Sequence, residues 1–138
     1  MAGQTLTFNR TLMNTKRNPV GWFEIYVQDM DRAKSFYERT FETKLERLDD
    51  TGDLEIWAFP MQPEKPGSPG ALVKMSGKDA GGGGTIIYFS CEDCGVEAVR
   101  ASQHGGEIQR EKFAIGRYGF IAFVLDPEGN LIGLHSMR

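Results

Sequence analysis

Cysteine and histidine are scarce in this sequence, which contains two of each. Cys91 and Cys94 stand too close together to close a useful loop, so they do not predict the disulfide framework of a secreted protein. Two acidic residues separate them in CEDC, and negative charge opposes thiolate formation, which argues against a redox dithiol. The glycines at 81–84 lack the spacing and the lysine of a phosphate-binding loop, and they predict a linker instead.

Long apolar runs and an excess of one charge are also missing. No stretch approaches the ~20 apolar residues that span a bilayer, and residues 1–19 lack the apolar core of a signal peptide. We therefore expect a cytoplasmic protein with no membrane contact. Sixteen basic and nineteen acidic residues give a net charge of −3, so nucleic acid is not an expected partner. With 138 residues, 40% of them hydrophobic, the chain suits one domain.

The sequence does contain a strand-helix pattern that occurs twice. Residues 22–29, WFEIYVQD, alternate like a strand, and the following DMDRAKSFYERTF has helical periodicity. Asp29 or Asp31 suits the N-cap of that helix, because a short carboxylate accepts from the free amides of the first turn. The residues expected to be buried on the helix are Ala33, Phe36, Tyr37 and Phe41.

The second copy begins at residues 86–93, IIYFSCED, and continues into CGVEAVRASQHGGEI. Positions 22 and 86, 29 and 93, and 56 and 120 correspond at a constant offset of 64. On the second helix we expect Val96, Val99 and Ala101 to be buried, His104 to lie at the cap and Gly105 to end the helix.

This repeat predicts an α+β fold made of two β-α-β-β-β modules, at 20–77 and 84–138. The segment 78–84, KDAGGGG, joins them, and 1–19 forms an N-terminal arm. Each module has one apolar sheet face, so the two modules are expected to curl toward each other or toward a partner chain and to leave a cleft between them.

These paired modules, the strand-helix VQDMDRAKSFYERTF, the helix end HGGEI and the terminal FVLDPEGNLIGL resemble the glyoxalase / bleomycin resistance / extradiol dioxygenase family, also called vicinal oxygen chelate proteins. The resemblance covers about residues 20–136 and is greatest to small PhnB-like and lactoylglutathione-lyase-like members. It implies a cup-shaped sheet around a small-molecule cavity, commonly in a homodimer.

Metal-using members of that family place His, Gln or Glu at the start of the first strand of each half and Glu near the end of the last. Carried over by position, those places fall on Trp22, Ile86, Val73 and Gly133. A divalent ion needs several oxygen or nitrogen donors, and none of these side chains supplies one. We therefore expect no metal and no other cofactor at the usual place.

Alternation along the strands places an aromatic-lined set of side chains in the cup. The expected ligand-binding residues are Trp22, Tyr26, Met75, Tyr88, Ser90 and, in the loop before a cup strand, Arg117. Glu24 and His135 are the candidate catalytic pair, because an imidazole titrates near neutrality and a carboxylate can orient it. A structural role for both residues is the alternative, with Glu24 paired to a cross-strand cation such as Lys74.

The sequence thus favours a metal-independent protein that binds or sequesters a small, partly apolar ligand in the cup. The rival interpretation is an enzyme, either a lyase or isomerase using Glu24 and His135 or a metalloenzyme with unmatched ligands. A dimeric interaction module with an empty cleft is the third. Ligand identity, and whether the modules pair within one chain or across a dimer, stay open.

Overall fold

The computed structural model describes residues 17–48 and 54–138. The first half contains β1 (Val20–Tyr26), α2 (Met30–Phe41), β2 (Glu46–Arg47), β3 (Leu54–Ala58) and β4 (Gly70–Met75). The second half contains β5 (Thr85–Ser90), α3 (Cys94–Gln103), β6 (Glu107–Ala114), the 3-10 turn η1 (Gly116–Tyr118), β7 (Phe120–Leu125) and β8 (Leu131–Ser136). Each half therefore follows the order β-α-β-β-β that the repeat predicts, and the α+β fold is confirmed.

All eight strands form one mixed sheet in the order β2-β3-β4-β1-β5-β8-β7-β6. The two halves join within the chain through the antiparallel pair β1–β5, while β1–β4 and β5–β8 are parallel. In that central pair Phe23 lies opposite Ile87, its own counterpart at the offset of 64. The pseudo-two-fold axis of the repeat therefore passes between these two residues.

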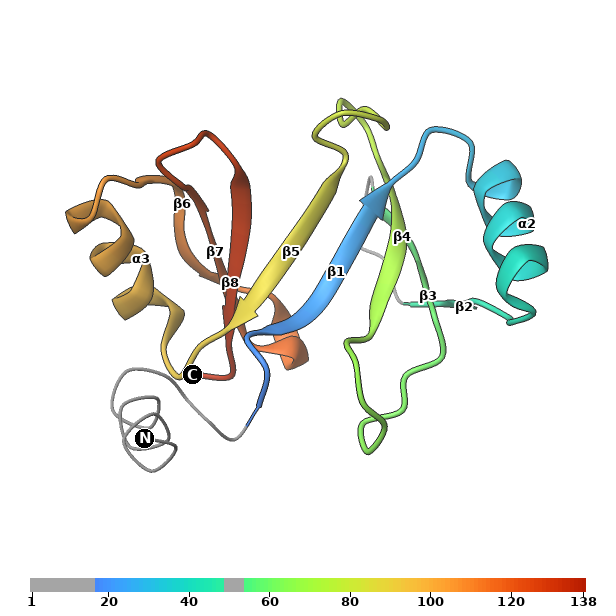
Figure 1. The fold of residues 1–138 in the computed structure, drawn as a ribbon, viewed down its shortest axis with the longest axis horizontal. Coiled ribbons are helices and arrows are strands. Elements are labelled where there is room, and N and C mark those ends of the chain that lie inside the picture. Colours follow the sequence, from blue (N-terminus) through green and yellow to red (C-terminus); the bar gives the residue numbers. More distant parts are fainter. Residues whose placement is uncertain (1–16, 49–53) are drawn as a thin grey trace, which may run out of the picture.

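The helices lie at opposite ends of the sheet, α2 beside the first half and α3 beside the second (Figure 1). The Asp29 side chain caps α2 by accepting from the backbone N–H of Arg32, which decides between the two predicted caps. Asp93 caps α3 in the same way, and His104 is its C-cap residue. Gly105 follows with φ of +95°, a left-handed conformation that glycine adopts without strain and that ends the helix.

The buried side of each helix differs from the sequence prediction. Phe36 and Phe41 are 58% and 63% exposed, and Val96 and Val99 are 49% and 51% exposed, so the prediction that these four are buried is wrong. The residues that do pack inward are Met30, Ala33 and Tyr37 on α2 and Cys94, Ala98 and Ala101 on α3. On α3 the residues that meet the sheet are small, because close packing leaves little room for larger ones there.

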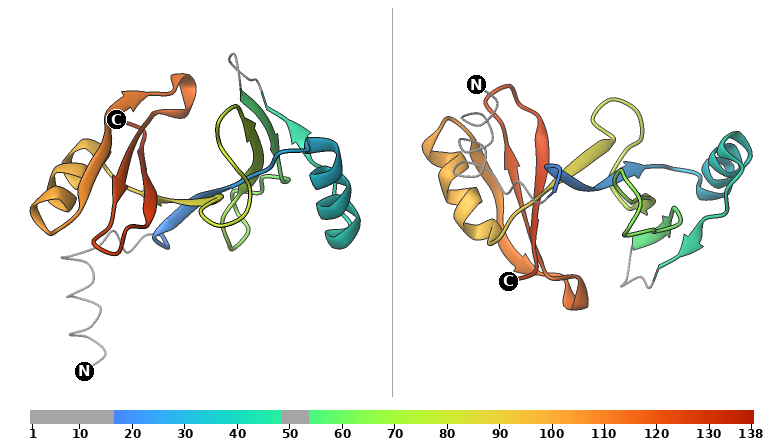
Figure 2. Two further views of the ribbon diagram at one scale, coloured as in Figure 1. Left: turned by 90° about the horizontal axis from the view of Figure 1, so that it is seen from above. Right: turned by 60° about the horizontal axis from the view of Figure 1, so that its bottom comes forward.

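The helices share one face of the curled sheet, here called the outer face, with Phe23, Ile25, Leu72, Ile87 and Leu134 (Figure 2). The opposite face, here called the cup face, carries Trp22, Glu24, Tyr26, Val73, Ile86, Tyr88, Phe123 and Gly133. In the described part of the chain, neither helix has the length and apolar character needed to cross a bilayer.

Candidate functional site

The cup face receives the strand residues that alternation predicted for it. The register pairs Trp22 with Tyr88, Tyr88 with Gly133, and Ser90 with His135 across β1, β5 and β8. Met75 lies at the end of β4, opposite Leu54, and is 37% exposed. Their role in ligand binding stays a prediction, but the fold places them on one surface.

At the centre of the cup face, three hydrogen-bond donors converge on the carboxylate of Glu24. Oε1 accepts from the hydroxyls of Tyr26 and Tyr88, each at 2.9 Å, and Oε2 accepts from Nε1 of Trp22 at 3.1 Å. Tyr26 and Tyr88 are 7% and 5% exposed. All three donors are neutral, so the cluster keeps the negative charge of the carboxylate.

The two tyrosines remain protonated in this cluster. Burial raises the pKa of Tyr26 and of Tyr88 well above the usual value, and the nearby Glu24 charge raises both further. A tyrosinate beside Glu24 would place two negative charges in a poorly solvated region. The hydroxyls therefore act as fixed donors toward Glu24.

We predict that the tyrosines make the protein less stable above pH 10. Below the unfolded pKa of about 10 both states are protonated and the contribution is fully present. Above it the unfolded state releases the protons first, so stability falls by up to ~1.4 kcal/mol per pH unit for each tyrosine. Tyr26→Phe should remove about one such increment, measured by urea unfolding between about pH 10 and 11.

The exposed Tyr118 (43% exposed) provides the matched control. Tyr118→Phe removes one tyrosine without removing a donor to Glu24, so the comparison isolates the effect that belongs to Tyr26. Equal slopes for the wild type and Tyr26→Phe would contradict the assignment of the raised pKa to Tyr26.

His135 belongs to a second polar group at another part of the cup face. Its Nε2 hydrogen-bonds the backbone carbonyl of Tyr118, and since a carbonyl only accepts, Nε2 carries a proton. Nη2 of Arg117 donates to the Tyr118 hydroxyl at 2.9 Å. Arg117 and His135 were predicted separately, and both form a hydrogen bond with Tyr118, Arg117 with its hydroxyl and His135 with its backbone carbonyl.

The structure does not bring Glu24 and His135 together. Glu24 lies two residues to one side of the Trp22–Tyr88–Gly133 row, and His135 two residues to the other, two strands away. Glu24 is hydrogen-bonded to Trp22, Tyr26 and Tyr88, whereas His135 is hydrogen-bonded to the backbone carbonyl of Tyr118, so the two candidate catalytic side chains have separate partners.

Lys74 is not the partner of Glu24. It lies opposite Glu55 in the β3–β4 pair, on the outer face. Trp57 also faces outward, packed in the α2 cluster with Nζ of Lys34 3.3 Å from its ring centroid. Its Nε1 donates to Glu55 at 2.9 Å, which makes Glu55 and Trp57 an outer-face counterpart of Glu24 and Trp22.

The glyoxalase / bleomycin resistance / dioxygenase grouping that the sequence resembles also emerges from comparison. A family model described as the Glyoxalase/Bleomycin resistance protein/Dioxygenase superfamily matches residues 20–134. The chain belongs to this superfamily. No curated protein matches the sequence at a significant level.

Several solved structures have a similar fold over most of this chain. A hypothetical protein, BH1468, from Bacillus halodurans C-125 has a TM-score of 0.66 at 14% identity, covering 86% of this chain and 94% of its own. Methylmalonyl-CoA epimerase from Mycobacterium tuberculosis has 0.63 at 16% identity, covering 87% and 88%. An uncharacterized protein from Methanosarcina mazei has 0.57 at 17%, covering 88% and 95%. At these identities the similarity shows the fold alone.

Metal-using members of the superfamily are expected to carry their metal ligands at four positions. In this chain those positions hold Trp22, Ile86, Val73 and Gly133, which offer no metal-binding oxygen or nitrogen atom in their side chains. Trp22 uses its indole N–H on Glu24, and Ile86 and Val73 pack with the tyrosines in the apolar cluster of the cup face. Within residues 17–48 and 54–138, no group of three or more His, Cys, Asp and Glu side chains is arranged to hold a metal ion.

Gly133, the fourth of these positions, is covered by an aromatic ring. A Cβ atom added there would overlap the Cγ, Cδ2 and Cε2 atoms of Tyr88. These atoms include the root of the ring, so the ring could not turn away without moving Tyr88 as a whole. The ring of Tyr88 therefore occupies the space that a side chain at position 133 would need.

We predict that Gly133→Ala destabilises the protein by about 1–3 kcal/mol, the usual cost of overpacking. In a Tyr88→Ala background the same change should cost almost nothing, because the ring is gone. Chemical denaturation of the two single variants and the double variant measures this coupling. Gly82, whose added Cβ would meet nothing within 4 Å, supplies the control Gly82→Ala. A fully stable Gly133→Ala protein would contradict the overlap.

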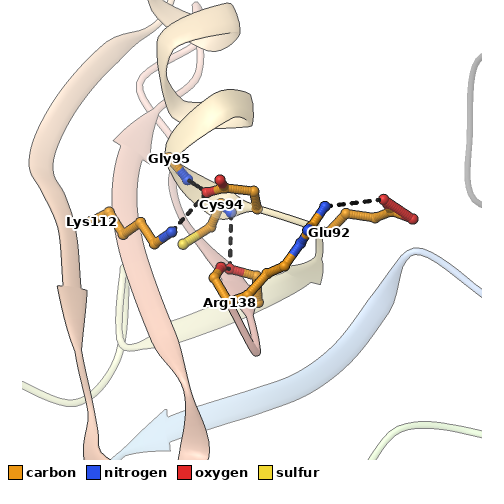
Figure 3. A network of polar contacts seen from close by, with 7 residues as sticks. Glu92, Cys94, Gly95, Lys112 and Arg138 are labelled. Atoms are coloured by element: carbon orange, nitrogen blue, oxygen red, sulfur yellow. Dashed lines mark hydrogen bonds and ion pairs between the residues drawn. The ribbon is translucent and has the colours of Figure 1, made fainter.

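Cys94 lies at the start of α3 (Figure 3), and Cys91 packs against the same buried cluster on the outer face. The backbone N–H of Cys94 donates to Oγ of Ser136 at 2.9 Å, and Lys112 Nζ lies 2.8 Å from Oδ1 of the capping Asp93. Burial, with a smaller effect of the Glu97 charge, raises the pKa of Cys91 to about 12. A thiol with that pKa stays protonated at neutral pH, in agreement with the argument against a redox dithiol.

Sequence reasoning missed the partner of Glu24 on β5. Tyr88 stands 64 residues after Glu24 and is therefore its repeat counterpart. In the antiparallel pair β1–β5, Tyr88 lies opposite Trp22, two residues from Glu24. Glu24 and its repeat counterpart Tyr88 are therefore diagonal neighbours on the same face. The offset of 64, combined with that pairing, was the signal that could have found this contact.

Proposed function

We propose that the protein binds a small, partly apolar molecule on the cup face, with the carboxylate of Glu24 as its polar anchor. The observation that supports this most is the convergence of Trp22, Tyr26 and Tyr88 on that carboxylate. A polar group fixed by three donors among aromatic rings is typical of small-molecule sites, where a few placed polar groups orient an apolar ligand.

The proposal includes metal independence. Donor-free side chains at Trp22, Val73, Ile86 and Gly133 support it, since a divalent ion needs converging oxygen or nitrogen ligands. Binding, sequestration or both then rely on the protein's own side chains. Ser90, Met75 and Arg117 are proposed to contact the outer parts of the ligand, away from Glu24.

The two tryptophans provide the test of the proposed site. Trp22 lies on the cup face and Trp57 on the outer face, and the sequence contains no other tryptophan. In a metabolite screen by ¹H–¹⁵N NMR, ligands of the site should shift the Trp22 indole resonance and leave that of Trp57 in place. Trp57→Phe assigns the two resonances. If no compound moves Trp22 selectively, the proposed site is wrong.

The second candidate function is a lyase or isomerase. The similarity in fold to methylmalonyl-CoA epimerase favours it. So does the hydrogen bond between Nε2 of His135 and the carbonyl of Tyr118, which fixes the ring of a residue type suited to proton transfer. If His135 acts as a general acid or base, His135→Ala should lower turnover of an identified substrate by about 10²-fold or more. A pure binding protein should show only a modest loss of affinity.

We also propose that the protein forms a homodimer through the middle of its outer face. The helices lie at the two ends of the sheet and leave the outer side of β1 and β5 without a helix over it (Figure 1). Ile87 is 38% exposed there, beside Phe23. A surface on a pseudo-two-fold axis presents similar apolar residues on both sides, which suits an isologous contact with a second copy.

Sedimentation equilibrium of Ile87→Glu tests the dimer. A charge in an apolar interface should shift the protein toward the monomer mass, because the buried carboxylate would lack a partner. Val99→Glu is the matched control, since Val99 is 51% exposed but lies on α3, away from the axis. A monomeric wild type, or a dimer that tolerates Ile87→Glu, would refute this interface.

A further inference from the structure

We propose that the ligand presents a cationic N–H group, such as a protonated amine, to Oε2 of Glu24. This inference rests on the proposed small-molecule function of the cup face and adds the chemical class of the ligand. Three features of the cluster support it, namely the number of free acceptor positions, the uncompensated charge and the aromatic surroundings.

The first feature is the distribution of hydrogen bonds over the two oxygens of Glu24. A carboxylate oxygen has two acceptor positions. Oε1 uses both, for the hydroxyls of Tyr26 and Tyr88, whereas Oε2 uses one, for the Trp22 indole. One acceptor position therefore remains, on Oε2. It selects a ligand with a donor, because an acceptor placed there would face the lone pair of the carboxylate.

The second feature is the charge of the cluster. The described ion pairs, Lys112–Asp93 and Arg138–Glu92, both lie near the start of α3 and do not include Glu24. Nζ of Lys78 is the cation placed nearest the cluster by a ring contact, 5.4 Å from the centroid of Tyr26, and it forms no ion pair with Glu24. A carboxylate held only by neutral donors in a half-buried site favours a charged donor, since charge-assisted hydrogen bonds are about twice as strong as neutral ones.

The third feature is the aromatic wall around the carboxylate. Tyr88 packs edge-to-face against Phe123 with ring centroids 5.9 Å apart, and Trp22 joins the same apolar cluster. Aromatic rings attract cations and also accept apolar groups. A molecule with an ammonium group on an aromatic or aliphatic body matches both the anchor and the wall. An anionic ligand would meet the Glu24 charge.

The test compares three probes of one size that differ in charge: benzylammonium, benzyl alcohol and benzoate at pH 7. Each is titrated into the ¹⁵N-labelled protein while the Trp22 and Trp57 indole resonances are followed. Benzylammonium should shift Trp22 saturably, and at least about tenfold more tightly than the other two, as expected for a hydrogen bond to a charged group. Trp57 should not respond.

Variants of matched chemistry locate the effect. Glu24→Gln removes the charge but keeps an acceptor for the tyrosines, and should weaken benzylammonium binding about tenfold or more. Glu55→Gln makes the same change at the outer-face Trp–Glu pair and should leave the affinity unchanged. Unfolding curves of both variants check that the fold is retained.

The remaining outcomes each overturn the inference. If all three probes shift Trp22 with similar affinity, the cup face binds ligands without charge selection, so the proposed function stands and the cationic class is wrong. If benzylammonium binds equally well to Glu24→Gln, the anchor is not the carboxylate. If no probe moves Trp22 while other compounds of the metabolite screen do, the site is real and its ligand is not an amine of this kind.

Discussion

The antiparallel pairing of β1 with β5 is the constraint on which the rest of the structure depends. It joins the two β-α-β-β-β halves into one sheet, and its register places the pseudo-two-fold axis between Phe23 and Ile87. A slip of one residue would turn every side chain of one half to the other face. Glu24 and Tyr88 would then lie on opposite faces of the sheet, and their hydrogen bond would be lost.

The cup face is asymmetric, although the backbone repeats. Glu24 and Tyr88 are counterparts at the offset of 64, as are Tyr26 and Ser90, and Trp22 and Ile86. An exact repeat would place either two carboxylates or two hydroxyls beside the axis. Divergence of the two halves instead gives one acceptor and its donors, which is why a single anchored site forms rather than two equivalent ones.

The strands could be predicted closely because their period is two, and a correct parity places every residue on its face. This succeeded for Trp22, Tyr88 and His135. Helix faces were predicted less well, since successive residues turn by about 100° and the packed side depends on the sheet beneath. Val96 and Val99 were expected to be buried, yet Cys94 and Ala98 fill that contact.

The hydrogen bonds of Glu24 could not be predicted from local spacing. Trp22 and Tyr26 flank it at two residues, but Tyr88 reaches it only through the tertiary register of β1 and β5. Lys74 was a reasonable candidate by charge, but the β3–β4 pairing places it opposite Glu55 on the other face. Polar partners depend on register and face together, and sequence patterns determine only the second.

Tyr88 links the polar cluster to the positions at which metal-using relatives are expected to bind their ion. Its hydroxyl donates to Glu24, while its ring covers Gly133. A glutamate at position 133 would need the volume of that ring, and removing the ring would take one of the two donors from Oε1. A metal ligand at position 133 and the Glu24 cluster therefore exclude each other in this sheet, because one aromatic side chain provides the donor and fills the space.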